Sequence, residues 1–215
     1  MELRRWNVKH VRMVLENTPT FTPFPRGAAV ASVRARVGEA AVAQFGPERY
    51  RNIMTSSRGH SVPVVNGHEQ EEGAERAARV VEHSHGAYRD LLSIDMAAAY
   101  PAQAGLTELR RSVALDRQVP GGKVTLSDSF ACANGGGEFQ SVLVTLLGVE
   151  IGTDDVRIGD AQGGVRFDPA SVAVSTETHR GVEKQYAPSV DVTRVLFATK
   201  ARACRGEVAL EIAPL

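Results

Sequence analysis

From about residue 50 to the end of the chain, apolar and polar positions change in short runs rather than with a helical period. Glycine, proline, asparagine and aspartate separate the runs, as at Asn66-Gly67 and Asp168-Pro169. Short runs bounded by such turn residues are typical of β-strands. They cover residues 61–65, 77–81, 91–96, 112–116, 123–126, 140–147, 156–158, 165–167, 171–174, 192–198 and 208–212. This spacing predicts an all-β fold, an antiparallel β-sandwich of two stacked sheets.

The chain divides into two parts of unequal regularity. Residues 1–45 show no clear period of 2 or 3.6 and contain three closely spaced prolines, so we expect an unassigned, partly disordered segment there. Residues 46–215 are expected to form a single β-sandwich domain. The one helical alternative within it, residues 97–111, is interrupted by Pro101 and Gly105.

Composition narrows the function classes. The formal net charge is zero and the pI is about 7.0, so no general attraction to nucleic acid or to an anionic membrane is expected. Residues 1–58 nevertheless hold ten Lys and Arg against four Asp and Glu, and such a basic part can meet an acidic polymer. No apolar run is long enough to span a membrane. The first residues lack the apolar centre of a signal peptide, which predicts a cytoplasmic chain as written. A true start further upstream would instead allow a periplasmic or secreted protein.

The two cysteines, Cys132 and Cys204, lie far apart in the sequence and without metal-type spacing. Two cysteines exclude a disulfide framework. One bridge or two buried thiols both remain open.

The segment from Arg49 to Gln70, RYRNIMTSSRGHSVPVVNGHEQ, carries the most informative candidate chemistry. His60 stands between a small polar run and an apolar strand over residues 62–65, which ends at an Asn-Gly turn. An imidazole in this place can ligate zinc, act as a general acid or base, or hydrogen-bond a sugar. From the residues alone, a lone histidine at a strand start is more often structural.

Arg49 and Tyr50 precede this histidine as a pair suited to carbohydrate. An arginine offers a bidentate fork to a uronate carboxylate, and a tyrosine offers a flat face with a hydroxyl tip. Packing beneath the sandwich is an equally good interpretation of Tyr50.

Other polar residues favour structural interpretations. His83 and His85 alternate, so in a strand they share one face and could chelate a metal, although a solvated edge is favoured. Asp95 stands in an apolar setting and needs a partner, which Arg110 or Arg111 could supply. Further members of this group are His68, expected to be exposed, His179, expected in a loop, and Asp128, interpreted as a strand-end residue. The sequence contains neither a nucleophile elbow nor a phosphate-binding loop.

Three blocks of the sequence resemble a known family. Residues 45–70, 91–117 and 121–130 are similar, in the same order, to the C-terminal β-sandwich domain of heparinase II/III-like polysaccharide lyases. The resemblance implies carbon–oxygen lyase chemistry, the β-elimination of uronic-acid-containing polysaccharides, in a cleft between this domain and an N-terminal α/α toroid. It also implies a zinc ion in the β-domain of the intact enzymes. By the resemblance His60 matches a zinc-binding histidine, Asn66 and Gln70 match polar positions around the next turn, and Arg49 and Tyr50 are further candidates for substrate binding.

The sequence departs from the family pattern at two points. The place of the metal-binding aspartate is taken by Arg34, and a cationic side chain cannot ligate zinc, so we expect this chain alone to bind none. Nothing N-terminal has the length or period of a toroid. We therefore expect a fragment of a lyase that is inactive without its toroid and whose partner is an acidic polysaccharide or oligosaccharide. The alternatives are a stand-alone β-sandwich that binds an acidic glycan and a structural module that mediates only oligomer contacts.

Overall fold

In the computed structural model the described residues are 53–54, 56–73, 75–133, 136–159, 164–184 and 187–213. Arg34, Arg49 and Tyr50 lie outside them, as does the whole segment 1–45. The described strands are β1 (Val64–Val65), β2 (Arg79–His85), β3 (Arg89–Asp95), β4 (Leu106–Asp116), β5 (Lys123–Cys132), β6 (Phe139–Thr145), β7 (Val149–Ile151), β8 (Asp155–Ile158), β9 (Gly164–Arg166), β10 (Val172–Lys184), β11 (Ala187–Thr199) and β12 (Arg205–Ala213). Three 3₁₀ turns accompany them: η3 (Ser57–Gly59), η4 (Ala97–Ala99) and η5 (Ala102–Ala104).

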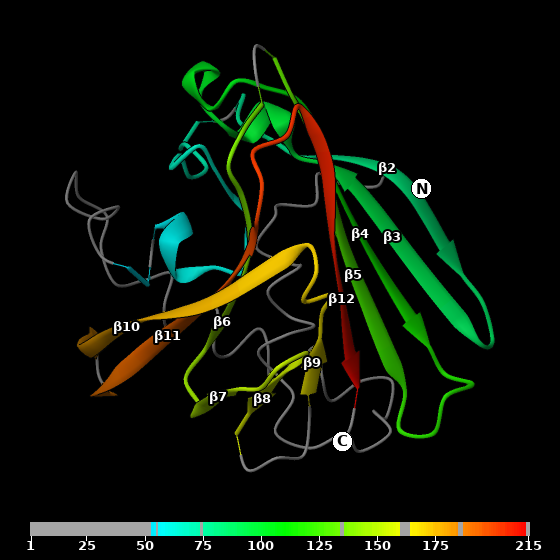
Figure 1. Ribbon diagram of the computed structural model, residues 1–215, viewed down its shortest axis with the longest axis vertical. Helices are drawn as coiled ribbons and strands as arrows, with labels where there is room; N and C mark the ends of the chain where they lie inside the picture. The colour runs from blue at the N-terminus through cyan, green and yellow to red at the C-terminus, as the bar shows by residue number, and fades with distance from the viewer. Residues whose placement is uncertain are drawn as a thin grey trace.

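The strands form two antiparallel sheets, which confirms the predicted fold class (Figure 1). One sheet has four strands in the order β1-β6-β11-β10, and the other has eight in the order β2-β3-β4-β5-β12-β9-β8-β7. Within the described residues, no helix is long and apolar enough to cross a membrane.

The core lies between the sheets because alternate residues of each strand point inward. In β5 the buried inward positions include Val124, Leu126 and Phe130. Phe130 stacks on Phe139 of β6, in the other sheet, with ring centroids 4.4 Å apart and planes 3° apart. A second apolar cluster lies on the opposite face of the four-stranded sheet and consists of Val64, Val142, Val144, Val192 and Leu196.

The turn predicted at Asn66-Gly67 is present. Both residues have a left-handed backbone, with φ of 51° and 75°, as a two-residue hairpin turn of type I′ requires. Val65 and His68, on either side of the turn, exchange backbone hydrogen bonds of 3.0 and 2.9 Å.

One local prediction needs correction. The apolar run 61–65 forms a strand only at Val64–Val65, because the side chain and carbonyl of Ser61 are engaged by β6 and β4 rather than by a strand ladder. Over residues 97–111 the structure agrees with the rejection of the helical alternative: they form the short turns η4 and η5 and then the first half of β4. Gly105, with φ of 68°, ends η5 in the left-handed conformation and lets the chain enter β4.

Candidate functional site

His60 follows the short turn η3 at the start of the segment leading into β1. Its backbone is extended, its N–H donates to the Ser57 carbonyl at 3.0 Å, and its side chain is half-buried. Gly59 precedes it in a position that only glycine fits, since an added Cβ would lie 2.0 Å from the Ile53 carbonyl oxygen. The position of His60 is therefore fixed by a tight local turn.

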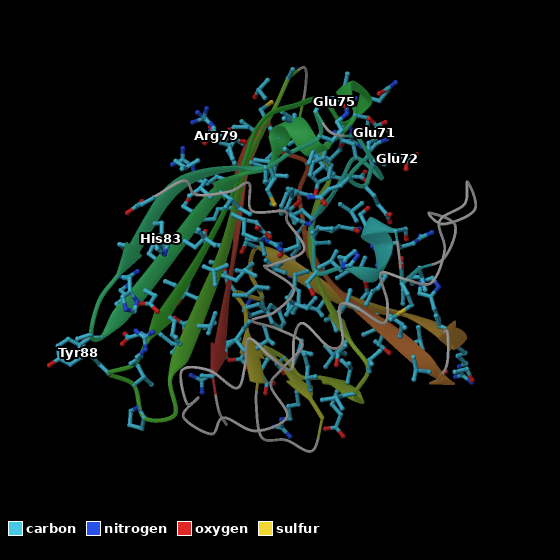
Figure 2. All side chains as sticks on the ribbon, turned by 180° about the vertical axis from the view of Figure 1, so that it is seen from behind. Glu71, Glu72, Glu75, Arg79, His83 and Tyr88 are labelled. Carbon is cyan, nitrogen blue, oxygen red and sulfur yellow. The ribbon has the colours of Figure 1, made fainter. Side chains whose placement is uncertain are left out.

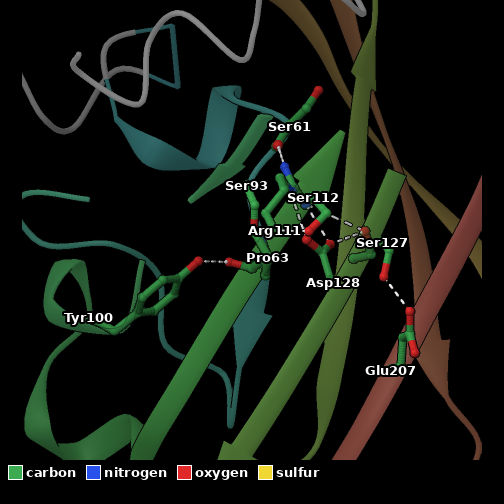
Figure 3. A network of polar contacts seen from close by, with 10 residues as sticks. Ser61, Pro63, Ser93, Tyr100, Arg111, Ser112, Ser127, Asp128 and Glu207 are labelled. Atoms are coloured by element: carbon green, nitrogen blue, oxygen red, sulfur yellow. Dashed lines mark hydrogen bonds and ion pairs between the residues drawn. The ribbon is translucent and has the colours of Figure 1, made fainter. Parts of the chain in front are cut away.

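A buried ion pair lies behind this segment (Figure 3). Arg111 of β4 and Asp128 of β5 are directly opposite in the eight-stranded sheet and are 1% and 0% exposed. The guanidinium donates from Nε to Oδ1 and from Nη2 to Oδ2, both at 2.6 Å. Ser141 of β6 donates from Oγ to Oδ2 at 2.6 Å, so the pair also joins the two sheets. Its bidentate geometry compensates for removing both charges from water.

The ion pair is bonded directly to the residue after His60. Arg111 Nη1 donates to the carbonyl oxygen of Ser61. Ser61 Oγ in turn accepts from the N–H of Val144 in β6 at 3.0 Å. The backbone that carries His60 is thus held by one polar contact from each sheet.

Tyr100 holds the same segment two residues further on. Its hydroxyl donates to the Pro63 carbonyl at 2.6 Å within the core. Burial raises the pKa of Tyr100 far above its usual value, so the side chain stays a neutral hydrogen-bond donor.

Replacing Tyr100 by Phe is expected to lower the free energy of unfolding by about 1–3 kcal/mol, because it removes the donor to a buried carbonyl. Urea unfolding measures the loss. Tyr88→Phe, at a side chain that is 65% exposed, is the matched control and should leave the midpoint unchanged. Equal midpoints for both variants would show that the Pro63 contact contributes nothing.

Beyond His60, charged residues gather around Glu69. Its carboxylate lies 3.5 Å from Arg58 Nε and 3.6 Å from Arg194 Nη2, and it accepts from Ser57 Oγ at 3.4 Å. Arg194 is 3% exposed and also pairs with Glu177 at 2.6 Å. These contacts connect the His60 turn to β10 and β11.

Gln70 and Asn66, both predicted as binding positions, have different surroundings. The Nε2 atom of Gln70 is buried and, among the described residues, has no hydrogen-bond partner. Asn66 donates from Nδ2 to the Ala104 carbonyl at 2.8 Å and accepts from the Glu138 N–H at 2.9 Å. Both ends of the Asn66 amide therefore fix the turn.

His83 and His85 lie on β2, whose residues are all exposed. Figure 2 shows His83 on the hairpin of β2 and β3, with Tyr88 at the tip of that hairpin. His85 Nδ1 lies 2.7 Å from Asp90 Oδ1. The hydrogen bond from Arg117 lowers the pKa of Asp90 to about 2, which keeps that carboxylate charged. Among the described residues, no three His, Cys, Asp or Glu side chains gather as a group that could hold a metal ion.

The partner expected for Asp95 is different in the structure. Asp95 pairs with Arg79 at 3.4 Å and accepts from the Ala97 N–H at 3.1 Å, while Arg111 binds Asp128. Asp128 was wrongly interpreted as a strand-end residue, since it lies within β5 and is fully buried. The alternation of β5 could have identified Asp128 as buried, because residues 126, 128 and 130 point to the same face of the strand.

The two sheets and their core define a heparinase-like fold. Heparinase III, the BT4657 gene product, matches with a TM-score of 0.58 and 12% identity, over 80% of this chain and 26% of that chain. The same gene product with methylated lysines matches with a TM-score of 0.60 at the same identity and coverage. A mutant of the heparan sulfate lyase HepC from Pedobacter heparinus gives a TM-score of 0.49 and 14% identity, over 91% of this chain and 27% of that chain.

This chain spans about a quarter of the length of these three structures. No protein-family model matches the sequence, and no curated protein matches it. At these identities the likeness establishes the fold, and the activity has to be argued from the site.

Proposed function

We propose that this chain is the C-terminal β-sandwich domain of a heparinase II/III-like polysaccharide lyase and that it contacts an acidic, uronic-acid-containing glycan. The observation that carries the proposal is the heparinase III fold match over 80% of the chain. The sequence resemblance gives it independent support, since its three blocks keep the order found in the family. The substrate class rests on the resemblance and on the heparinase neighbours.

His60 is the residue we assign to this contact within the described part of the chain. It is half-buried, and the backbone beside it is held by Arg111 and by Val144. A side chain on a fixed backbone loses little further entropy when it binds a ligand. Gln70 adds an amide whose Nε2 is buried and has no hydrogen-bond partner among the described residues. Arg49, Tyr50 and Asn66 complete the proposed set, with Asn66 shaping the turn.

In this proposal the β-domain holds glycan, and elimination requires the groups of an α/α toroid. A zinc ion is part of the family pattern, but the described residues contain no three-ligand group of the kind that structural zinc sites use. The chain's own residues provide polar contacts to hydroxyl and carboxylate groups.

Heparan sulfate immobilised on a column tests the proposal. The purified chain is expected to be retained at low salt and released as salt rises, because contacts to a polyanion are screened. His60→Ala is expected to weaken binding about tenfold, which corresponds to about 1.4 kcal/mol. His83→Ala, at an exposed histidine on β2, is the matched control and should bind like the parent chain.

Two outcomes separate the proposal from its alternatives. An increase in ultraviolet absorbance from an unsaturated uronate product, made by the chain alone, would place the elimination chemistry in this domain. No retention of heparan sulfate, alginate or another uronate polymer would instead favour a β-sandwich with a structural role.

A further inference from the structure

The fold brings Cys132 and Cys204 together although 72 positions separate them in the sequence. Strand β5 ends at Cys132, and β12 begins one residue after Cys204. In the register of these strands Arg205 faces Ala131, and one further step would place Cys204, in the bend before β12, opposite Cys132. The Cys132 N–H donates to the Cys204 carbonyl at 2.8 Å, which continues the ladder to this pair.

A pair of residues in this register has a Cα separation within the range that a disulfide spans. Residues facing each other as a hydrogen-bonded antiparallel pair have Cα atoms about 5.5 Å apart. Disulfides span Cα separations of roughly 4.4–6.8 Å. The side chains of directly opposite residues also emerge on the same side of a sheet.

The neighbouring dipeptide Gly136–Gly137 borders both cysteines. An added Cβ on Gly137 would lie 2.7 Å from Cys132 Sγ, and one on Gly136 would lie 3.2 Å from the Cys204 nitrogen. Glycine at these two positions therefore allows the chain to pass close to the cysteine pair without a side chain colliding with it.

We propose that Cys132 and Cys204 form a reversible intramolecular disulfide, a modification site that fastens the end of β5 to the start of β12. Both cysteines are free thiols in the structure, Cys132 buried and Cys204 exposed. The exposed thiol gives an oxidant access, and the buried thiol lies across the ladder from it. The inference is independent of the proposed glycan function.

The oxidant is a small disulfide such as oxidised glutathione. The Cys204 thiolate attacks one glutathione sulfur, forming a mixed disulfide and releasing one glutathione thiolate. The Cys132 thiolate then attacks Cys204 Sγ and releases the second glutathione. Two protein thiols are oxidised, their two protons leave with the products, and one glutathione disulfide is reduced to two thiols.

Burial raises the pKa of Cys132, and the nearby Cys204 thiol raises it further. A higher pKa reduces the thiolate fraction of Cys132 at neutral pH, so the rate of closure is expected to increase with pH.

The experiment titrates the full chain with oxidised glutathione and reads intact mass and non-reducing peptide maps. The expected result is a monomer lighter by two hydrogen atoms, with the Cys132 and Cys204 peptides joined. Because the bridge closes a long loop, thermal unfolding should shift upward by several degrees, and reduction should reverse the shift. Cys204→Ser should show neither change.

Three results would overturn the proposal. The first is a stable glutathione adduct on Cys204 with Cys132 still free, and the second is a disulfide-linked dimer. The third is a chain that stays fully reduced after the titration, as shown by maleimide labelling of both thiols once the chain is unfolded. Cys132→Ala provides a second variant without the buried thiol, and it should stop at the glutathione adduct.

Discussion

Replacing Asp128 by Ala is expected to lower the free energy of unfolding by about 3–5 kcal/mol. The substitution leaves the guanidinium of Arg111, which is 1% exposed, without its carboxylate partner in the core. It also removes the acceptor of the Ser141 hydroxyl. Equilibrium unfolding in urea, followed by far-ultraviolet circular dichroism, measures the loss.

A double variant tests whether the stability loss of Asp128→Ala comes from the unpaired buried charge or from the smaller side chain. Arg111→Met combined with Asp128→Leu removes both charges together, and we expect it to recover part of the stability lost by Asp128→Ala. The matched control is Asp95→Ala, whose partner Arg79 has a side chain that is 79% exposed. That variant should lose at most about 1 kcal/mol. Equal losses for Asp128→Ala and Asp95→Ala would contradict the assignment of the buried pair.

The double variant also removes the bond from Arg111 to the Ser61 carbonyl. A chain that regains stability but binds glycan more weakly would show that the ion pair also positions the His60 segment. The buried pair would then fix the position of the His60 segment, which a hydrophobic replacement does not do.

The two-sheet fold could be predicted from the sequence because the signals of strands and turns are local. The Asn66-Gly67 turn, the alternation of β5 and the alternation of β12 can each be seen within a short stretch of the sequence. The prediction failed at the residues after His60, because Ser61 is bound by contacts to Arg111 and Val144 rather than by its sequence neighbours. Such contacts depend on which strands pair.

The same reason explains the missed site residues. Arg110 or Arg111 was expected beside Asp95; the register places Arg110 opposite Asp95 and Arg111 opposite Asp128. The contact of Arg194 with Glu69 joins β11 to a loop more than a hundred residues earlier. His60 was expected at the start of a strand, whereas it follows the turn η3 and its charged surroundings come from distant strands.

Phe139→Ala is expected to lower the free energy of unfolding by about 3–5 kcal/mol, as large-to-small changes of buried aromatic residues do. Phe139 is 1% exposed and stacks on Phe130 of the opposite sheet, so its removal opens a cavity where the two sheets meet. Strand β6 lies between β1 and β11 and cannot move to fill that space without disturbing both ladders.

Differential scanning calorimetry and urea unfolding measure this effect, with Tyr88→Ala as the control at an exposed aromatic residue. The control should change stability by no more than about 0.5 kcal/mol. Phe139→Leu keeps part of the volume and is expected to lose less than Phe139→Ala, because the cavity term grows with the volume removed. A Phe139→Ala chain as stable as the Tyr88→Ala chain would mean that the sheets do not meet at this stack, and the packing of the sandwich core would have to be redrawn.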